Sequence, residues 1–345
     1  MNKEISRRSF IGRTCATAAC TSMLGLSSLG SSCSVTDRSP GQPGGKSAKK
    51  KDAVGPVVVS RDDAKVFATH GHDATRVKQL VHRAVADLVG VKDPREAFRA
   101  LFKPSDVVAI KPNCLAGPGM SSSVSIVDAL VSGLRAIGIE NENIYIWERT
   151  SAELNQAGFE LNRYSQTRPR CLGNDDAGFE RNIEFSGDVG SLFTNILARR
   201  ATALINVPVL KDHDLSGVGC GMKNMYGAIH NPNRYHENNC DPYVADVSAH
   251  RYVKDKLRLV LADALTAQYQ GGPARVSEHQ WKPAKILAAT DPVALDRVAQ
   301  KLLEDERKKH GMATLTESRR PPKWLKTAAT KYKLGEHRLD KIKLA

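Results

Sequence analysis

Lys211 and His213 lie two positions apart, just after the apolar run 203–209. Side chains two positions apart on an extended backbone project to the same side, so both can reach one ligand. A lysine neutralises a carboxylate or phosphate, or acts as a base where it is desolvated, and a histidine transfers protons near neutral pH. We therefore predict a catalytic or ligand-binding role for this pair. A salt-bridged surface loop is the alternative.

A glycine-rich segment, 217–221, follows this pair and leads into Lys223 and Asn224. Glycine allows backbone N–H groups to approach an anion closely, and a helix N-terminus favours negative charge. The spacing is not that of a phosphate-binding loop or a dinucleotide fingerprint, so ordinary turn glycines are the alternative. We predict an anion-binding segment whose ligand-binding residues are Gly219, Gly221, Lys223 and Asn224.

Three other apolar runs also end in polar or ionisable residues. Lys111 and Asn113 follow the run 106–110, Asp263 follows 257–262, and Asp291 follows 285–289. In an open parallel sheet, ligands bind beyond the carboxyl ends of the strands, so we expect these side chains to face one pocket. The prediction gives Lys111, Asn113 and Asp291 a ligand-binding role and Asp263 a catalytic one. Helix capping is the alternative for both aspartates.

Strand-like apolar runs alternate with segments of helical spacing along the chain. Apolar residues recur at helical spacing in 74–89, 124–137 and 293–304, between strands such as 144–147. This alternation predicts an α/β fold with a mostly parallel, doubly wound sheet flanked by helices. The pattern weakens over 151–190, which suggests an inserted lobe or lid at that place.

The metal-binding potential of the chain is weak. The residue types of His230, His236, Cys240 and His250 suit a transition metal, but their spacing matches no closed zinc pattern. A metal or an organic cofactor is left open. An iron–sulfur cluster on local cysteines is not expected, because no C-x-x-C motif occurs among the cysteines after Cys33. These cysteines form either one disulfide or only buried thiols, and they are Cys114, Cys171, Cys220 and Cys240.

The formal charge of +14 over 345 residues is concentrated at the two ends of the chain. Residues 1–33 carry +3, residues 34–52 carry +3 and residues 301–345 carry +7, which leaves about +1 for the body. Basic ends of this kind are typical of solubilising or surface-binding segments. Since no basic motif is interleaved with aromatic residues, specific nucleic-acid binding is not expected.

The N-terminus resembles an export signal of the twin-arginine type. Arg7 and Arg8 precede Phe10 and a small, mildly apolar run, which predicts a signal peptide over 1–33 and the twin-arginine machinery as a partner. The expected location is periplasmic or on the outer face of the cytoplasmic membrane. Cys33 lies in an approximate lipoprotein box, so lipidation there and ordinary cleavage are both open. Membrane contact is expected only through this lipidation or through the basic tail.

The remaining chain divides by composition. Residues 34–56 are rich in glycine, proline and lysine and predict a flexible linker. Residues 57–305 contain the alternating pattern and predict the α/β domain, and residues 306–345 predict a basic C-terminal extension.

Five ordered blocks between 108 and 296 resemble the family called domain of unknown function 362. The resemblance implies a shared α/β core, with Lys111, Asn113, Lys211, His213, Lys223, Asn224 and Asp291 in its characteristic motifs. The family has no general assigned reaction. Some members carry added ferredoxin-like cysteine clusters, which this sequence lacks. The blocks are VAIKPN at 108–113, INVPVLKDH at 205–213, GMKNMYG at 221–227, LVLADAL at 259–265 and ATDPVALD at 289–296.

Together these features predict an exported enzyme that acts on a small anionic molecule in a pocket at the strand ends. In this hypothesis the lysines bind and polarise anionic groups, and His213 is the acid or base. The alternative is a non-catalytic periplasmic protein that binds a ligand or handles a cofactor in the same pocket. A pocket with strongly shifted lysine and histidine pKa values would favour the enzyme.

Overall fold

The computed structural model describes residues 57–61 and 72–345. The predicted signal peptide and linker, 1–56, lie outside the described residues. Among the described residues, no helix combines the length and apolarity needed to cross a membrane.

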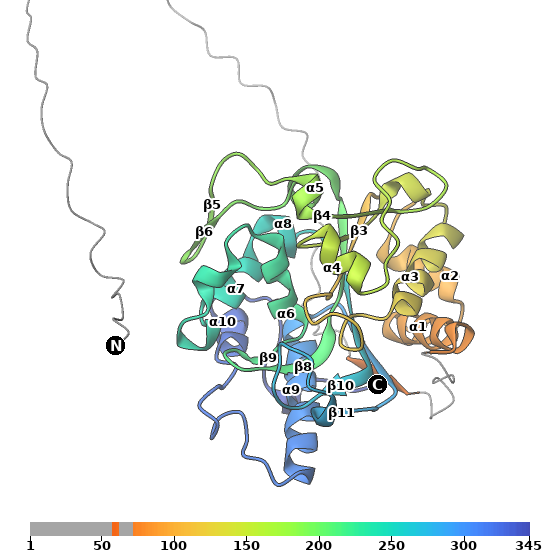
Figure 1. The fold of residues 1–345 in the computed structure, drawn as a ribbon. Helices are drawn as coiled ribbons and strands as arrows, with labels where there is room; N and C mark the ends of the chain where they lie inside the picture. The colour runs from red at the N-terminus through yellow and green to blue at the C-terminus, as the bar shows by residue number, and fades with distance from the viewer. Residues whose placement is uncertain (1–56, 62–71) are drawn as a thin grey trace, which may run out of the picture. The chain divides into compact units, whose positions relative to one another are not determined.

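A large mixed sheet forms the centre of the described chain, in the order β1-β12-β10-β7-β2-β3-β4 (Figure 1). The neighbours from β10 to β4 run parallel, whereas β12 is antiparallel to both β10 and β1. The strands are β1 (Val58–Arg61), β2 (Val108–Pro112), β3 (Ile144–Glu148), β4 (Arg170–Gly173), β5 (Glu184–Ser186), β6 (Val189–Ser191), β7 (Ala203–Val207), β8 (Val209–His213), β9 (Gly217–Val218), β10 (Leu257–Gln268), β11 (Gln280–Trp281) and β12 (Lys285–Ala289).

Helices cover both faces of this sheet, as Figure 1 shows. Val108 and Ile110 of β2 pack into a core with α1 to α3, whereas Ala109 between them packs into a core with α6, α7, α9 and α10. A strand covered on both faces needs apolar residues at every position, which explains the continuous apolar runs of the sequence. The helices are α1 (Ala74–Val89), α2 (Pro94–Leu101), α3 (Val124–Ala136), α4 (Ser151–Gln156), α5 (Asn174–Ala177), α6 (Gly221–Asn224), α7 (Tyr243–Ala249), α8 (Arg251–Lys254), α9 (Pro292–Lys309) and α10 (Trp324–Thr330).

The α/β fold class predicted from the sequence is confirmed. Local signals explain where α1 begins and ends. Asp73 accepts hydrogen bonds from the backbone of Thr75 and Arg76 and caps the helix, and Gly90 ends it with a φ of 79°. The stripe of buried apolar residues on α1 faces the sheet side of the helix, as its helical spacing predicts.

The 151–190 stretch is divided between two sheets. β4 joins the main sheet beside β3, whereas β5 and β6 form a separate hairpin. This hairpin lies against α7, where the Ser186 hydroxyl donates to the Asp246 carbonyl over 2.6 Å. The stretch thus contributes one strand to the main sheet and one separate hairpin.

The predicted boundary at residue 305 is corrected by the structure. α9 continues to Lys309, and Trp324 and Leu325 of α10 are buried in the core. The Trp324 indole N–H donates to the Ser216 carbonyl over 3.2 Å, and the Arg320 guanidinium pairs with the buried Asp212 at 2.6 Å. Residues 306–345 are thus part of the domain. The count of charges missed this, because it did not take account of the apolar side chains that lie between the basic ones.

The substitution Trp324→Ala tests this integration. Removing a fully buried tryptophan leaves a cavity and should lower the free energy of unfolding by about 3–5 kcal/mol. The measurement is urea denaturation followed by circular dichroism. Tyr164→Ala is the matched control, since Tyr164 is 84% exposed and should change stability by less than about 0.5 kcal/mol. Equal stability of both variants and the wild type would contradict the packed C-terminal segment.

Candidate functional site

A cavity of about 440 Å³ opens where β2, β3 and β8 end. Asn113 follows β2, Glu148 is the last residue of β3, and Lys211 and His213 both come from β8. The predicted same-side placement of Lys211 and His213 is confirmed, because both side chains line this cavity. The cavity is lined by Asn113, Leu115, Glu148, Arg149, Glu153, Lys211, His213, Asp214, Leu215, Gly219, Lys223, Asn224, Tyr226, Gly227, Pro232, Asn233, His236 and Pro273.

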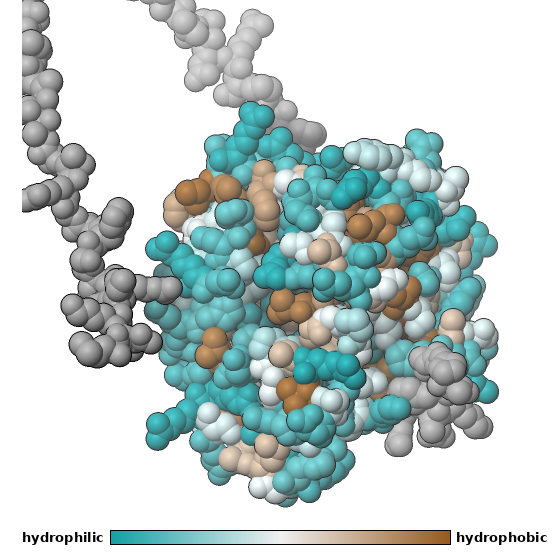
Figure 2. All heavy atoms as spheres, in the orientation of Figure 1, coloured by the Kyte–Doolittle hydropathy of each residue, from teal (hydrophilic) through white to brown (hydrophobic). Residues whose placement is uncertain are grey.

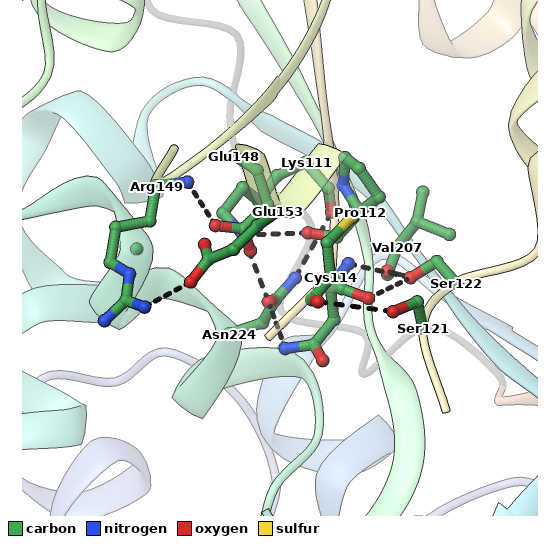
Figure 3. Close-up of polar contacts among 12 residues, drawn as sticks. Lys111, Pro112, Cys114, Ser121, Ser122, Glu148, Arg149, Glu153, Val207 and Asn224 are labelled. Carbon is green, nitrogen blue, oxygen red and sulfur yellow. Dashed lines mark hydrogen bonds and ion pairs between the residues drawn. The ribbon is translucent and has the colours of Figure 1, made fainter. Parts of the chain in front are cut away.

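A buried ion pair between Lys111 and Glu148 lies beside the cavity (Figure 3). Lys111 Nζ also donates to the Pro112 carbonyl at 2.8 Å, so its charge is fully engaged. Burial alone would raise the pKa of Glu148, but the Lys111 charge and the Arg149 backbone N–H lower it below its ordinary value. Lys111 is therefore a neutralised structural cation and not a lining residue of the cavity.

Side-chain amides connect this ion pair to Lys211. Asn224 Oδ1 accepts from Lys111 Nζ at 3.3 Å and from Asn113 Nδ2 at 3.0 Å (Figure 3). Asn113 Oδ1 in turn accepts from Lys211 Nζ at 2.7 Å. Asn224 Nδ2 donates to Asn206 Oδ1 at 2.8 Å, which fixes the amide orientation. The two asparagines therefore hold Lys211 in place without adding a negative charge.

Lys211 has no carboxylate partner within ion-pairing distance among the described residues. Its side chain is buried, and burial lowers its pKa to about 8 even though Glu148 acts in the opposite direction. Without a paired carboxylate, the charged form is destabilised by loss of water. Lys211 can therefore bind an anion when protonated, or act as a base at mildly alkaline pH.

Lys223 is the second cation in the cavity without a carboxylate partner in the part of the chain that the structure describes. Its Nζ donates to His236 Nε2 at 3.2 Å and lies 3.8 Å from the centre of the Tyr226 ring. Burial lowers its pKa to about 8. His236 is also held neutral, because burial and the Lys223 charge lower its pKa. Its Nε2 is occupied as an acceptor.

His213 is a neutral side chain whose protonated nitrogen can be assigned. Its Nδ1 accepts from the backbone N–H groups of Leu215 at 3.1 Å and Ser216 at 3.3 Å. Asp214 Oδ1 also lies 3.0 Å from Nδ1, but this carboxylate is 62% exposed and competes with two main-chain donors. Burial, followed by the Lys223 charge, lowers the pKa of His213 to about 2. We therefore assign the proton to Nε2, which makes the ring a hydrogen-bond donor.

Two carboxyl groups, those of Glu148 and Glu153, also line the cavity. Both are drawn in Figure 3. Glu153 accepts a hydrogen bond from the Arg149 guanidinium through Oε1, while its buried Oε2 receives no donor. Burial raises the pKa of Glu153, and the nearby Glu148 carboxylate adds to the shift. The two pKa values are therefore shifted in opposite directions, and Glu153 is the more basic carboxyl group of the pair.

The backbone of the glycine segment does not serve as a free anion site. The N–H groups of Gly221 and Met222 donate to the Asp296 carboxylate at 2.6 and 2.8 Å, and Gly219 N–H donates to the Lys211 carbonyl at 2.9 Å. The predicted role of Gly221 is corrected for this reason. Gly219 does line the cavity.

The two predicted aspartates lie away from the cavity. β10 continues through Asp263, whose Oδ2 accepts from Ser123 N at 2.8 Å and Ser123 Oγ at 2.7 Å and so holds the start of α3. Asp291 follows β12. Because β12 runs antiparallel to β10, Asp291 lies at the opposite end of the strands. There it caps α9 by accepting from Ala294 N at 2.8 Å. Neither aspartate faces the cavity, which corrects the prediction for both.

The four metal candidates do not gather at one point. His230 packs edge-on against Phe179, and His250 stacks on Phe193, whereas His236 lines the cavity. Among residues 57–61 and 72–345 no group of three histidine, cysteine or acidic side chains is placed to hold a metal ion. The same range contains four buried thiols and no disulfide, and these thiols belong to Cys114, Cys171, Cys220 and Cys240.

Several site residues were not predicted from the sequence. Glu148 ends an apolar run, which is the same signal that singled out Lys111, so it could have been found. Glu153 and Arg149 follow in the next turn and carry no pattern of their own. Asp296 lies on the buried face of α9 beside Val293 and Ala294, and an acidic residue at such a position indicates a buried partner.

The fold and the site define an α/β protein with a pocket at the carboxyl ends of its parallel strands, lined by amides and by charged groups of both signs. The chain belongs to the family described as domain of unknown function (DUF362), whose model matches residues 108–301. No curated protein matches the chain.

Among solved structures, the chain is similar to a Thermotoga maritima protein determined by the Northeast Structural Genomics Consortium. The identity is 11% and the TM-score is 0.41, over 67% of this chain. The match spans 59% of the length of that protein.

A comparison of two lysine variants tests the difference in charge pairing. Lys111→Met leaves Glu148 buried without its partner and should lower the free energy of unfolding by about 3–5 kcal/mol. Lys211→Met removes an unpaired buried cation and should change stability by less than about 1 kcal/mol. The measurement is urea denaturation of ligand-free protein at pH 7.

The double variant Lys111→Met with Glu148→Leu is the control, because removing both charges should restore most of the loss. A Lys211→Met variant as unstable as Lys111→Met would contradict the assignment of Lys211 as the unpaired lysine.

Proposed function

We propose that this chain is an exported protein whose pocket binds a small anionic molecule and holds groups that can transfer a proton to or from it. The observation that carries the proposal is the contrast between Lys111 and Lys211. Both lysines are buried, but only Lys111 has a carboxylate partner. A buried cation without a partner is unfavourable in the ligand-free protein.

An anion in the pocket would pair with the buried Lys211 charge and offset its unfavourable free energy. Lys211 and Lys223 both line the cavity and both have a pKa lowered to about 8, so each remains mostly protonated at neutral pH. His213 adds a neutral N–H donor from β8. The Asp214 carboxylate is exposed at the entrance and does not pair with either lysine. The deep part of the pocket thus offers donors and positive charge to an anionic group.

Catalysis, if the bound anion is a substrate, falls to groups other than the histidines. The ring nitrogens that could accept a proton are already occupied in both His213 and His236. The two lysines, with a pKa of about 8, provide the groups that exchange protons near neutral pH, and the raised pKa of Glu153 makes it the more basic carboxyl group of the cavity pair. Perturbed pKa values that cluster in one pocket favour an enzyme over a simple binding protein.

Binding without turnover is the second candidate, because an anionic organic cofactor would meet the same lysines as a substrate. Protein purified from its own compartment distinguishes these cases when its bound small molecules are identified by mass spectrometry. A molecule that is retained unchanged indicates binding or cofactor handling, whereas its conversion indicates an enzyme.

Anion binding should depend on pH through the two lysines. Their charged forms bind the anion, so affinity should be greatest below about pH 7 and fall as pH rises through about 8, by up to about tenfold per unit for each lysine. The measurement is ligand-observed NMR with acetate and with inorganic phosphate. Lys211→Met and Lys223→Met should each weaken binding by about tenfold or more, since hydrogen bonds to charged groups contribute about 1.5–3 kcal/mol.

Lys326→Met is the control, because Lys326 is exposed and does not line the cavity. It should bind both anions as the wild type does. Absence of binding by either anion in the wild type, or equal binding in all three variants, would overturn the proposed function.

Export rests on the paired arginines of the N-terminus. Replacing Arg7 and Arg8 by lysine should retain the protein in the cytoplasm, because the twin-arginine machinery reads this pair. Cell fractionation followed by immunoblotting measures the distribution. The control exchanges Lys3 for arginine, which leaves the pair intact. Unchanged periplasmic recovery of the Arg7 and Arg8 variant would contradict export by this route.

A further inference from the structure

The pocket changes in character from its deep end to its entrance. At the deep end Lys211, Asn224 and His213 are buried and polar. At the entrance two lining residues, Leu115 and Leu215, are large and apolar although they are 48% and 44% exposed. Apolar surface also interrupts the hydrophilic surface near the middle of the face that carries α4, α6 and β9 (Figure 2).

The two leucines come from separate parts of the chain. Leu115 lies in the loop between β2 and α3, and Leu215 lies in the turn between β8 and β9. Pro232, at the start of a 3-10 helix, and Pro273, in the loop between β10 and β11, line the cavity as well. Four segments far apart in the sequence thus contribute apolar side chains to one cavity. Covering such surface is favourable, so it fits a ligand with an apolar part.

The size of the cavity leads to the same conclusion. A volume of about 440 Å³ lies in the range of pockets that hold small organic molecules. Acetate or phosphate would occupy only the region next to Lys211 and Lys223. The rest of the cavity leaves room for a further group on the ligand.

We infer that the ligand is an anionic amphiphile, a molecule with one anionic head group and an apolar tail, which binds with the head at Lys211 and Lys223 and the tail between Leu115 and Leu215. This inference rests on the proposed function, since it uses the same two lysines. It adds the orientation: the head group enters first and the tail points toward solvent.

The test is a chain-length series of straight-chain carboxylates, from acetate through butyrate and hexanoate to octanoate, with full-length protein at pH 7. Each added methylene should raise the affinity by about twofold to fourfold until the tail passes the two leucines. Dissociation constants are measured by ligand-observed NMR. A parallel series of alkyl phosphates shows whether the head-group site prefers a carboxylate or a phosphate.

The variants separate the tail from the head. The double variant Leu115→Ser with Leu215→Ser should flatten the dependence on chain length, so that octanoate loses much more affinity than acetate. Lys211→Met should weaken every member of the series by a similar factor. Leu344→Ser is the matched control, because Leu344 is 58% exposed and does not line the cavity, and it should behave as the wild type.

Three results would overturn the inference, and each does so for a different reason. If acetate and octanoate bind equally to the wild type and both are weakened in Lys211→Met, the amphiphile is excluded and the anion site stands. If no member of either series binds, the proposed function fails and the inference fails with it. A chain-length effect that persists in the double leucine variant would also exclude the assigned tail position.

Discussion

The site depends on one buried ion pair, between Lys111 at the end of β2 and Glu148 at the end of β3. The two strands are parallel neighbours, so their carboxyl ends bring these side chains together beneath the pocket. Asn224 accepts from Lys111 and from Asn113, and Asn113 accepts from Lys211. The network thus links three strands and α6 through side chains whose partners are fixed. One carboxylate neutralises one of its two lysines, and the second lysine stays charged at the cavity wall.

This arrangement assigns different tasks to similar residues. Lys111 is structural because its charge is satisfied, whereas Lys211 and Lys223 meet the cavity with lowered pKa values. His213 and His236 are neutral for related reasons, since burial and adjacent lysines disfavour a further positive charge. Proton exchange near neutral pH therefore belongs to the two lysines. The Asp296 carboxyl oxygens already accept the backbone N–H groups at the start of α6, so these donors are not available to a bound anion.

Sequence reasoning located part of this site and failed elsewhere for identifiable reasons. The two-residue spacing placed Lys211 and His213 on one side of β8, and the strand-end rule brought Asn113 to the same cavity because β2, β7 and β8 follow the parallel pattern on which the rule depends. It failed for Asp291 because the direction of β12 cannot be read from an apolar run, and for Asp263 because β10 continues beyond it. It also ranked Lys111 with Lys211, since only the tertiary structure shows which lysine meets Glu148. Composition likewise treated 306–345 as a basic tail, although Trp324 packs in the core.

The central claim is that Lys211 and Lys223 are unpaired cations that receive an anion. Titration of the lysine side-chain ¹⁵N signals by NMR tests it most directly, with Lys211→Met and Lys223→Met spectra to assign the two resonances. We expect both lysines to titrate near pH 8 in the ligand-free protein, and a bound anion to move both titrations to higher pH. Titration of both at the ordinary lysine value of about 10.4, with no response to an added anion, would contradict it.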